Sequence, residues 1–337
     1  DYMFRMQIQS KKKCIWYCSA AVSFLLFLLL NLWCDHLVNM QDAQQMAGRW
    51  SEKKDVAQVS CFFSSKAEVT EDTIQSFEYS LKNVLQEASI TETSENPSAR
   101  LWVDAYSADG KITLVNGKNT LDANAIGIGG DFFLFHPLKL ITGSYFSGND
   151  LMQDYCIIDQ DAAWQLFGSN DVVGMTVYIG NVPHIVTGVV RRPQGRMEKA
   201  AGLTSTVVYV SYETLETYGT SNGINHYEIV MPNPVDEFAY GKVKDGIGID
   251  EKNVEIVENS RRYSLPNRIK TILAFGTRSM NGKAIIYPYW ENLARGYEDI
   301  IALLTVFMLF LLLYPVVTVI WCFVHWWRHK GWTLKDV

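Results

Sequence analysis

Two long stretches without a charged residue constrain this chain more than any other feature. They span residues 14–34 and residues 300–324. A helix of roughly 20 apolar residues is long enough to cross the ~30 Å hydrocarbon layer of a bilayer, whereas a buried core helix or the apolar part of a cleaved signal peptide is shorter. The sequence therefore predicts two uncleaved transmembrane helices, at residues 14–34 and 299–325.

Basic residues beside both stretches predict the orientation, because Lys and Arg close to a span are retained on the cytoplasmic side. They are Arg5, Lys11, Lys12 and Lys13 before the first stretch and Arg328, Lys330 and Lys335 after the second. Residues 1–13 and 326–337 are thus predicted to be short cytoplasmic segments. Residues 35–298 are predicted to form an extracytoplasmic domain with stalk helices at both ends, the first of them over residues 35–50.

Charge and cysteine content narrow the function classes. With +3 on residues 1–13 and +2 on residues 325–337, the net charge of −6 leaves −11 for the rest of the chain. Nucleic acids select basic surfaces, so a nucleic-acid partner is not expected. Cys61 and Cys156 lie outside the spans, and the sequence leaves open whether they form a disulfide.

Within residues 35–298, short strands alternate with short helices. The clearest helix is residues 71–87, with apolar residues on one face at 3.6-residue spacing. Asp109-Gly110 and Gly180-Asn181 each predict a hairpin turn between two strands. The fold class predicted is α+β, with prominent antiparallel hairpins.

Three further helices are predicted from their capping residues. Asp159 and Ser211 each follow an apolar strand and are good N-caps, and Gly168 would end the first of these helices. Asn233-Pro234 predicts a third helix, with Pro at its first position.

No pattern indicates catalysis, a cofactor or a metal. Residues 127–130 (Gly-Ile-Gly-Gly) fit no nucleotide-binding loop and are predicted to be a turn. The basic stretch at 191–199 is predicted to be a solvated loop, with contact to a partner as the alternative. The six histidines are scattered without metal-ligand spacing, so most are expected in surface or hairpin positions; they are His36, His136, His184, His226, His325 and His329. No catalytic, cofactor-binding or metal-binding residue is assigned, and an enzyme is not expected.

Polar residues within the spans predict helix packing. Pro315 leaves a backbone carbonyl without its helical donor, which is tolerated where a neighbouring helix supplies one. Asn31, Thr305 and Thr318 are the predicted donors across helices.

A set of short motifs lies between residues 136 and 211. They are Leu140-Ile141-Thr142-Gly143-Ser144-Tyr145-Phe146 with Asp150, Cys156-Ile157-Ile158-Asp159 with Ala162-Ala163 and Leu166-Phe167-Gly168, Asp171-Val172-Val173-Gly174-Met175, Val186-Thr187-Gly188-Val189-Val190, and Val208-Tyr209-Val210-Ser211. Together they resemble the extracytoplasmic core domain of MacB-like and FtsX-like ABC-transporter permeases. The order of span, outer domain and span agrees as well, over about residues 14–325.

The resemblance implies a permease or permease-like subunit in a bacterial plasma (inner) membrane. It implies an ABC ATPase and other membrane subunits, either copies of this chain or other permease chains, as partners, and ATP-driven motion passed to the outer domain. Such permeases have two further spans after this point, which residues 1–337 do not contain. The alternatives are a two-span scaffold or sensor that binds an envelope partner or ligand, and a membrane-anchored enzyme.

Overall fold

The computed structural model describes residues 2–52, 55–91, 100–277 and 284–329, with side chains from residue 14 onward. Two compact units are present. The helical unit comprises Asp1–Met40, Arg268–Ala274 and Tyr297–Val337, and the core domain comprises Gln41–Asn267 and Phe275–Gly296. The predicted cytoplasmic segments fall largely outside the described side chains, so their placement stays a prediction, as do the predicted domain boundaries.

The described residues of the core domain form one sheet of eleven strands. These are β1 (Val56–Phe63), β2 (Val103–Asn116), β3 (Asn119–Gly130), β4 (Leu140–Gly143), β5 (Tyr155–Asp159), β6 (Thr176–Ile179), β7 (Val182–Val190), β8 (Val207–Ser211), β9 (Thr220–Ser221), β10 (His226–Pro232) and β11 (Val254–Glu258). The main path runs β11-β1-β10-β2-β3-β8-β5-β7-β4, with β6 pairing β2 and β7, and β9 pairing β2. Two pairs, β3–β8 and β5–β7, are parallel and the others are antiparallel.

Helices connect and cover these strands. The α-helices are α1 (Tyr2–Asn39), α2 (Met46–Trp50), α3 (Glu71–Glu87), α4 (Phe132–Phe135), α5 (Gln160–Phe167), α6 (Arg196–Ala200), α7 (Tyr212–Tyr218), α8 (Phe238–Gly246), α9 (Leu265–Ala274) and α10 (Tyr289–His329). Short 3-10 turns are η1 (Asp42–Gln44), η2 (Ser65–Ala67) and η3 (Asn259–Arg261). The mixture of strands and helices confirms the predicted α+β class.

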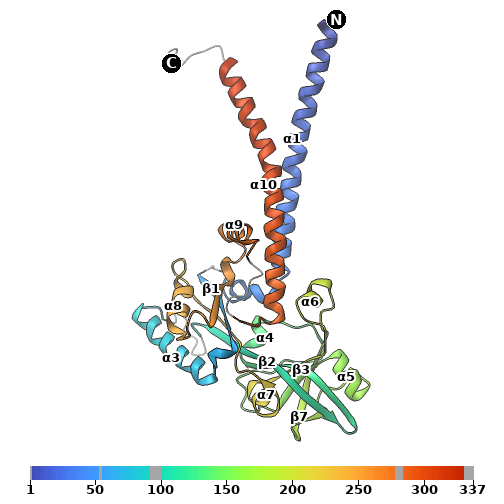
Figure 1. Cartoon of the computed structure of the whole chain (residues 1–337), viewed down its shortest axis with the longest axis vertical. Coiled ribbons are helices and arrows are strands. Elements are labelled where there is room, and N and C mark those ends of the chain that lie inside the picture. The colour runs from blue at the N-terminus through green and yellow to red at the C-terminus, as the bar shows by residue number, and fades with distance from the viewer. Residues whose placement is uncertain (1, 53–54, 92–99, 278–283, 330–337) are drawn as a thin grey trace. The chain divides into compact units, whose positions relative to one another are not determined.

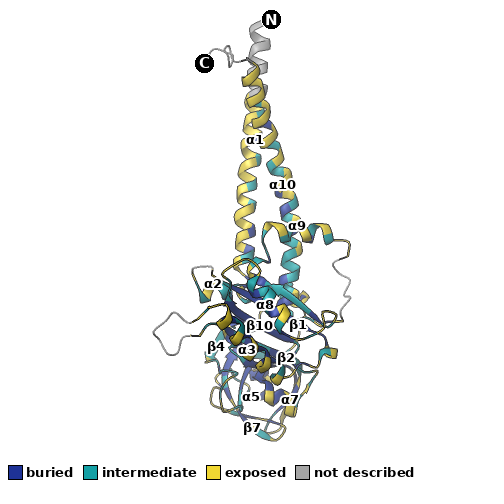
Figure 2. Ribbon diagram, turned by 90° about the vertical axis from the view of Figure 1, so that its left-hand side faces the viewer, coloured by how far each residue is buried: buried dark blue, intermediate teal, exposed yellow. Residues whose placement is uncertain are grey.

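Two apolar clusters hold the core domain together, because side chains of a strand alternate between the two faces of a sheet. Tyr227 and Ile229 of β10 join the larger cluster, which takes residues from α3, α5, α7 and α8. Val230 joins the second cluster, which contains the phenylalanines of α4 and Trp290 of α10. In Figure 1, α3 and α8 lie side by side, and Figure 2 shows the strands of the domain largely buried.

Most helices predicted from local signals are confirmed. Helix α3 covers the predicted residues 71–87. The side chain of Asp159 accepts a hydrogen bond from the Ala162 N–H, Gly168 ends α5 in a left-handed conformation, and the side chain of Ser211 caps α7. Helix α8 begins at Phe238, four residues later than predicted, although Asn233 Oδ1 still accepts a hydrogen bond from the backbone N–H of Ala239.

One predicted hairpin is wrong. Asp109 and Gly110 lie within the continuous strand β2, and the chain reverses at Gly117 instead. The Asp109 carboxylate accepts a hydrogen bond from Asn225 Nδ2 at 2.7 Å, which takes the place of a local turn contact. A Cβ at Gly110 would lie 2.3 Å from the carbonyl oxygen of Thr220, so β9 can approach β2 this closely only because residue 110 has no side chain. The second predicted hairpin, around Gly180-Asn181, is confirmed.

The Gly-Ile-Gly-Gly stretch at residues 127–130 is not a turn but the end of β3. Its glycines make room for side chains that pack across the sheet. A Cβ at Gly127 would lie 2.8 Å from a methyl group of Leu215, and one at Gly129 would lie 2.0 Å from the ring of Tyr106.

The first stalk helix is shorter than predicted, because α1 ends at Asn39. Residues 42–50 form η1 and α2 instead of a continuation. The Gln58 side chain of β1 bonds the intervening backbone: its Nε2 donates to the Ala43 carbonyl and its Oε1 accepts from the Met46 N–H. The path of this segment is thus set by a strand that follows it.

Among the residues that the structure describes, two helices are long and apolar enough to cross a membrane, over Cys14–Asn39 and Tyr289–Arg328. Within the helical unit, Ser23 Oγ of α1 donates a hydrogen bond of 2.7 Å to the carbonyl of Leu311. That carbonyl is the one that Pro315 leaves without a helical donor, so the predicted compensation is confirmed.

The predicted cross-helix roles of the threonines are wrong. Thr305 and Thr318 donate to the carbonyls of Ile301 and Tyr314 in their own helix. Such bonds to the preceding turn are common for Ser and Thr in helices and satisfy the hydroxyl locally.

Candidate functional site

A buried polar cluster on strand β10 is the most distinctive group of side chains in the core domain. His226 and Glu228 are two residues apart on this strand, and alternation places both on the sheet face that also bears Val230. The neighbouring strands complete the floor of the cluster. Ser60 of β1 is paired with Glu228, and Ser107 of β2 is paired with His226.

His136 joins the cluster from the segment that follows α4. The three phenylalanines of α4 anchor this segment in the second apolar cluster. Arg49 of α2 holds its end, because Nη2 donates to the carbonyl of Leu134 at 2.7 Å and to that of Phe135 at 3.3 Å. The His136 side chain is thereby fixed close to a strand some ninety residues away.

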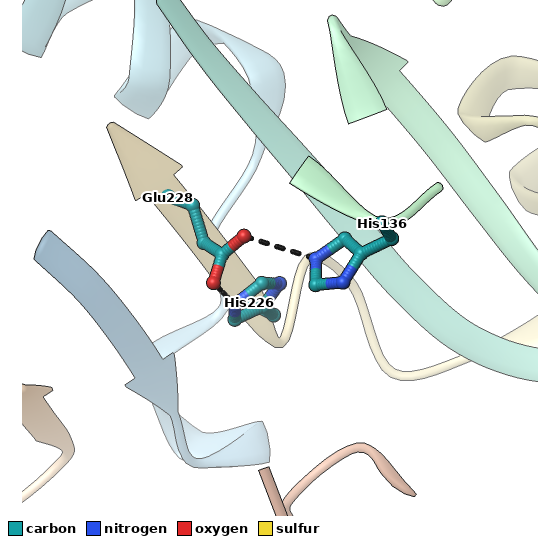
Figure 3. A group of neighbouring side chains, drawn as sticks. All are labelled: His136, His226 and Glu228. Carbon is teal, nitrogen blue, oxygen red and sulfur yellow. Dashed lines mark ion pairs between the residues drawn. The ribbon is translucent and has the colours of Figure 1, made fainter. Parts of the chain in front are cut away.

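The two imidazoles flank one carboxylate (Figure 3). His136 Nε2 lies 2.9 Å from Glu228 Oε2, and His226 Nε2 lies 3.2 Å from Glu228 Oε1. These are ion-pair distances, yet His136 Nε2, His226 Nε2 and Glu228 Oε2 have no well-directed hydrogen bond to any described residue. The three donor atoms lie within 4.8 Å of one another, close enough for one cation to contact all three.

A second layer of polar groups orients the carboxylate and one ring. Ser60 Oγ donates a 2.6 Å hydrogen bond to Glu228 Oε1 and accepts one of 2.6 Å from Asn259 Nδ2. Ser107 Oγ lies 3.3 Å from His226 Nδ1.

Burial determines the charge states of the cluster. The side chains of His136, His226 and Glu228 are 3%, 1% and 1% exposed. Burial lowers the pKa of His136 below its ordinary value, which favours the neutral imidazole. Burial by itself would raise the pKa of Glu228, but charge attraction to a protonated imidazole and hydrogen bonding to the two rings hold it well below its ordinary range, so the carboxyl is ionised before either ring loses its proton.

Aromatic side chains close the cluster off. The Trp290 ring lies 4.3 Å from the His136 ring and 5.3 Å from the His226 ring, measured between centroids. Phe62 stacks on His226 at 5.0 Å, and Phe132 lies 4.6 Å from His136. Trp290 belongs to the first turn of α10, so this helix begins against the cluster.

A buried ion pair fixes the same turn of α10. Arg262 donates two hydrogen bonds to Glu291, of 2.7 and 2.6 Å, and both side chains are at most 2% exposed. Arg295, one turn further along, donates to Glu291 at 2.7 Å and to Glu255 of β11 at 2.6 Å. Burial by itself would lower the pKa of Arg262, but Glu291 raises it above its ordinary value.

Several histidines differ from the sequence expectation. His136 and His226 are buried, not on the surface, whereas His184 is buried but lies in the predicted hairpin of β6 and β7. Alternation along β10 could have placed His226 and Glu228 together, but no local signal points to His136. The sequence predicted no metal-ligating group, and the cluster is one that sequence reasoning missed.

The basic stretch at 191–199 and the two cysteines outside the spans do not form a site with the polar cluster. In the basic stretch at 191–199, Arg192 pairs with Asp159 at 2.8 Å and with Asp161 at 2.5 Å, and residues 196–200 form α6. Cys61 and Cys156 are both buried and free, so the structure does not join them.

Known proteins resemble the core domain. The model of the family described as MacB-like periplasmic core domain matches residues 40–258. The macrolide export ATP-binding/permease protein MacB of Pasteurella multocida is 31% identical over 83 residues, which are 24% of this chain and 13% of that protein. Its counterpart in Chromobacterium violaceum is 31% identical over 96 residues, or 28% and 14% of the two chains. The chain thus spans only about an eighth to a seventh of the length of these relatives.

Solved structures are also similar. The periplasmic region of MacB from Actinobacillus actinomycetemcomitans aligns with a TM-score of 0.41 and 20% identity, covering 67% of this chain and 94% of that one. The extracellular domain of the noncanonic ABC-type transporter YknZ from Gram-positive bacteria aligns with a TM-score of 0.39 and 19% identity, covering 60% and 100%.

Proposed function

Because the chain belongs to the family of MacB-like periplasmic core domains, we propose that it is a permease-like membrane subunit of a MacB/FtsX-type ABC transporter assembly. The observation that carries the proposal is the family match over residues 40–258, in a chain that also has two helices able to cross a membrane. The predicted family resemblance and fold class are confirmed. The chain is a membrane protein with an extracytoplasmic domain.

In the proposed arrangement both termini are cytoplasmic and the core domain lies outside the plasma membrane. The basic residues beside the two spans support this orientation. The partners proposed are an ABC ATPase and further membrane subunits, since two spans are too few to enclose a pathway. The relatives in Pasteurella and Chromobacterium are named as ATP-binding/permease proteins, which supports an ATPase as partner.

The proposed task of the core domain is to respond to ATP-driven movement of the spans. Helix α10 supports this role, since its first two turns are held in the domain by Glu291 and Arg295. A buried, two-hydrogen-bond pair resists displacement better than an exposed one, because removing either partner leaves an uncompensated charge. Motion of this helix would therefore act directly on β11, which carries Glu255, and on Arg262, which follows η3.

Capture from native membranes tests the proposal. The full chain, tagged at its C-terminus and extracted in mild detergent, is purified and its partners are identified by mass spectrometry. We expect an ABC ATPase to be enriched over an unrelated two-span control protein. Recovery of the chain alone, or only with envelope scaffold proteins, would contradict the proposal and favour the scaffold hypothesis.

A second measurement tests transmission. In the captured assembly, alkylation of the buried Cys61 is followed with ATP and with a non-hydrolysable analogue. We expect nucleotide to change the labelling rate in the wild type and Glu291→Gln to abolish that change. Glu251→Gln, which removes the exposed partner of Lys244, serves as the matched control.

A further inference from the structure

We propose that His136, His226 and Glu228 form a binding site for one divalent transition-metal ion, with zinc as the favoured ion. Three observations carry this inference: the donor set, its geometry, and the absence of well-directed hydrogen bonds from three of its atoms to the described residues. The site is independent of the proposed transport function.

The donor set is one that zinc uses. Two imidazole nitrogens and one carboxylate oxygen form a known three-residue zinc set, and imidazole ligands also suit copper and nickel. Calcium and magnesium prefer oxygen ligands and are disfavoured by two nitrogens. Metal binding requires a neutral imidazole and an ionised carboxylate, and this donor set can supply both.

The distances are of the size that a metal site requires. With metal–ligand bonds of about 2.0–2.2 Å, two tetrahedral ligands lie about 3.4 Å apart. His136 Nε2 lies 2.9 Å from Glu228 Oε2, and His226 Nε2 lies 3.2 Å from Glu228 Oε1. One ligand atom from each of the three residues lies within 4.8 Å of the others, so small side-chain adjustments would bring all three onto one ion.

Buried polar atoms without partners are rare in native proteins and call for an explanation. His136 Nε2, His226 Nε2 and Glu228 Oε2 are three such atoms, and all belong to this cluster. One cation would satisfy them together. An ion pair alone does not satisfy these atoms, because neither ring N–H points at the carboxylate well enough to form a hydrogen bond.

The surroundings resemble those of a metal site. Ligating imidazoles usually bond a further group through their other nitrogen, and ligating carboxylates are themselves hydrogen-bonded. Ser107 stands at Nδ1 of His226, and Ser60 donates to Glu228. Among the described residues, the other charged or titratable groups that interact with the cluster are Arg49, Arg262, Asp109 and Cys61; Glu291 pairs with Arg262.

The ion would fasten the segment after α4 to strand β10. Through Trp290, which packs on both imidazoles, it would also stiffen the place where α10 begins. The proposed role is structural, since the three ligands are almost fully buried and leave little access for a substrate.

The test is metal content of the full chain in mild detergent. The protein is stripped with EDTA, re-equilibrated with zinc, dialysed, and measured by plasma mass spectrometry; cobalt gives an absorption spectrum that reports tetrahedral coordination. His136→Gln removes one ligand, and Ser107→Ala removes a supporting group. His184→Gln is the matched control, because His184 is equally buried but bonds Thr214 elsewhere in the domain.

We expect one zinc per chain in the wild type and in His184→Gln, with no competition from a large excess of magnesium. Ser107→Ala should lower the affinity about ten- to a hundredfold, and His136→Gln by more than that. Less than one-tenth equivalent of zinc in the folded wild type overturns the proposal. Equal retention by His136→Gln, or equal loss by His184→Gln, also overturns it, since either shows that these residues do not specify the binding.

Discussion

Removing the buried carboxylate of Glu291 should destabilise the core domain far more than removing an exposed one. Glu291 neutralises Arg262, which is 2% exposed, and also accepts a hydrogen bond from Arg295. Glu291→Gln keeps the size of the side chain but leaves Arg262 charged and buried. Breaking a buried pair in this way costs about 3–5 kcal/mol. Glu251→Gln, whose partner Lys244 is 44% exposed, should cost far less, because exposed pairs contribute little to stability.

Alkylation of Cys61 measures this difference in the full chain. Its thiol is fully buried on β1, so labelling requires opening of the domain. At 1.4 kcal/mol per factor of ten, Glu291→Gln should speed the reaction by about a hundred- to a few thousandfold. Cysteines in the spans are distinguished by mass spectrometry of the labelled peptides.

The refuting result is a Glu291→Gln rate within tenfold of that of Glu251→Gln. The double replacement Arg262→Met with Glu291→Met gives a second check. It removes both charges, so most of the lost stability should return. If the double variant is as unstable as Glu291→Gln, packing and not the uncompensated charge explains the loss.

Three other predictions concern different parts of the chain. Burial and the neighbouring Asp104 raise the pKa of Glu78 to about 8, so stability should fall as pH rises from about 4.5 to 8. Glu78→Gln removes that fall. Measured by alkylation of Cys61, its free energy of unfolding should match that of the wild type at pH 5 and exceed it by about 2 kcal/mol at pH 8. Gly129→Ala should destabilise the domain by about 1–3 kcal/mol, because its Cβ would overlap the Tyr106 ring. Ser23→Ala should weaken the association of the two spans by about 1 kcal/mol in a membrane dimerisation assay of the isolated helices, because it removes the donor to the carbonyl that the proline frees.

Each of these has a contradicting result. A Glu78→Gln difference that is the same at pH 5 and pH 8 would show that the carboxyl is not protonated in the folded state. A neutral Gly129→Ala would show that the Tyr106 ring moves aside at no cost. Unchanged association in Ser23→Ala, with Ser23→Thr as control, would show that water or lipid serves the carbonyl equally well.

Elements that depend on local signals were predictable. Helix α3 has its apolar face, its acidic first turn and its ends within seventeen residues, and it was found with the right bounds. The caps at Asp159 and Ser211 are similar, because each side chain bonds a backbone N–H only three residues away.

Features set by distant partners were not predictable. Asp109-Gly110 has the composition of a turn, but Asn225 and the carbonyl of Thr220 hold it in a strand. Likewise α1 ends because Gln58, which lies beyond it in sequence, bonds the backbone of the following residues. Both outcomes depend on contacts that sequence spacing does not encode.

The polar cluster falls between these cases. The His226-Tyr227-Glu228 spacing is visible once β10 is recognised as a strand, and it places the imidazole beside the carboxylate. His136 is brought in by α4 and Arg49, which requires the tertiary structure. Sequence reasoning could have found two of the three ligands.

The position of β1 in the sheet has a consequence for folding during synthesis. This strand is hydrogen-bonded on one side to β10 and on the other to β11, the last strand of the domain. A newly made β1 therefore has both edges open until β10 is made, and one edge open until β11 follows, nearly two hundred residues after β1. Open edges of this kind invite pairing with other chains. The nascent domain should thus be most prone to aggregation and cleavage before its final strand arrives, and a truncation just ahead of Val254 should leave it unable to close.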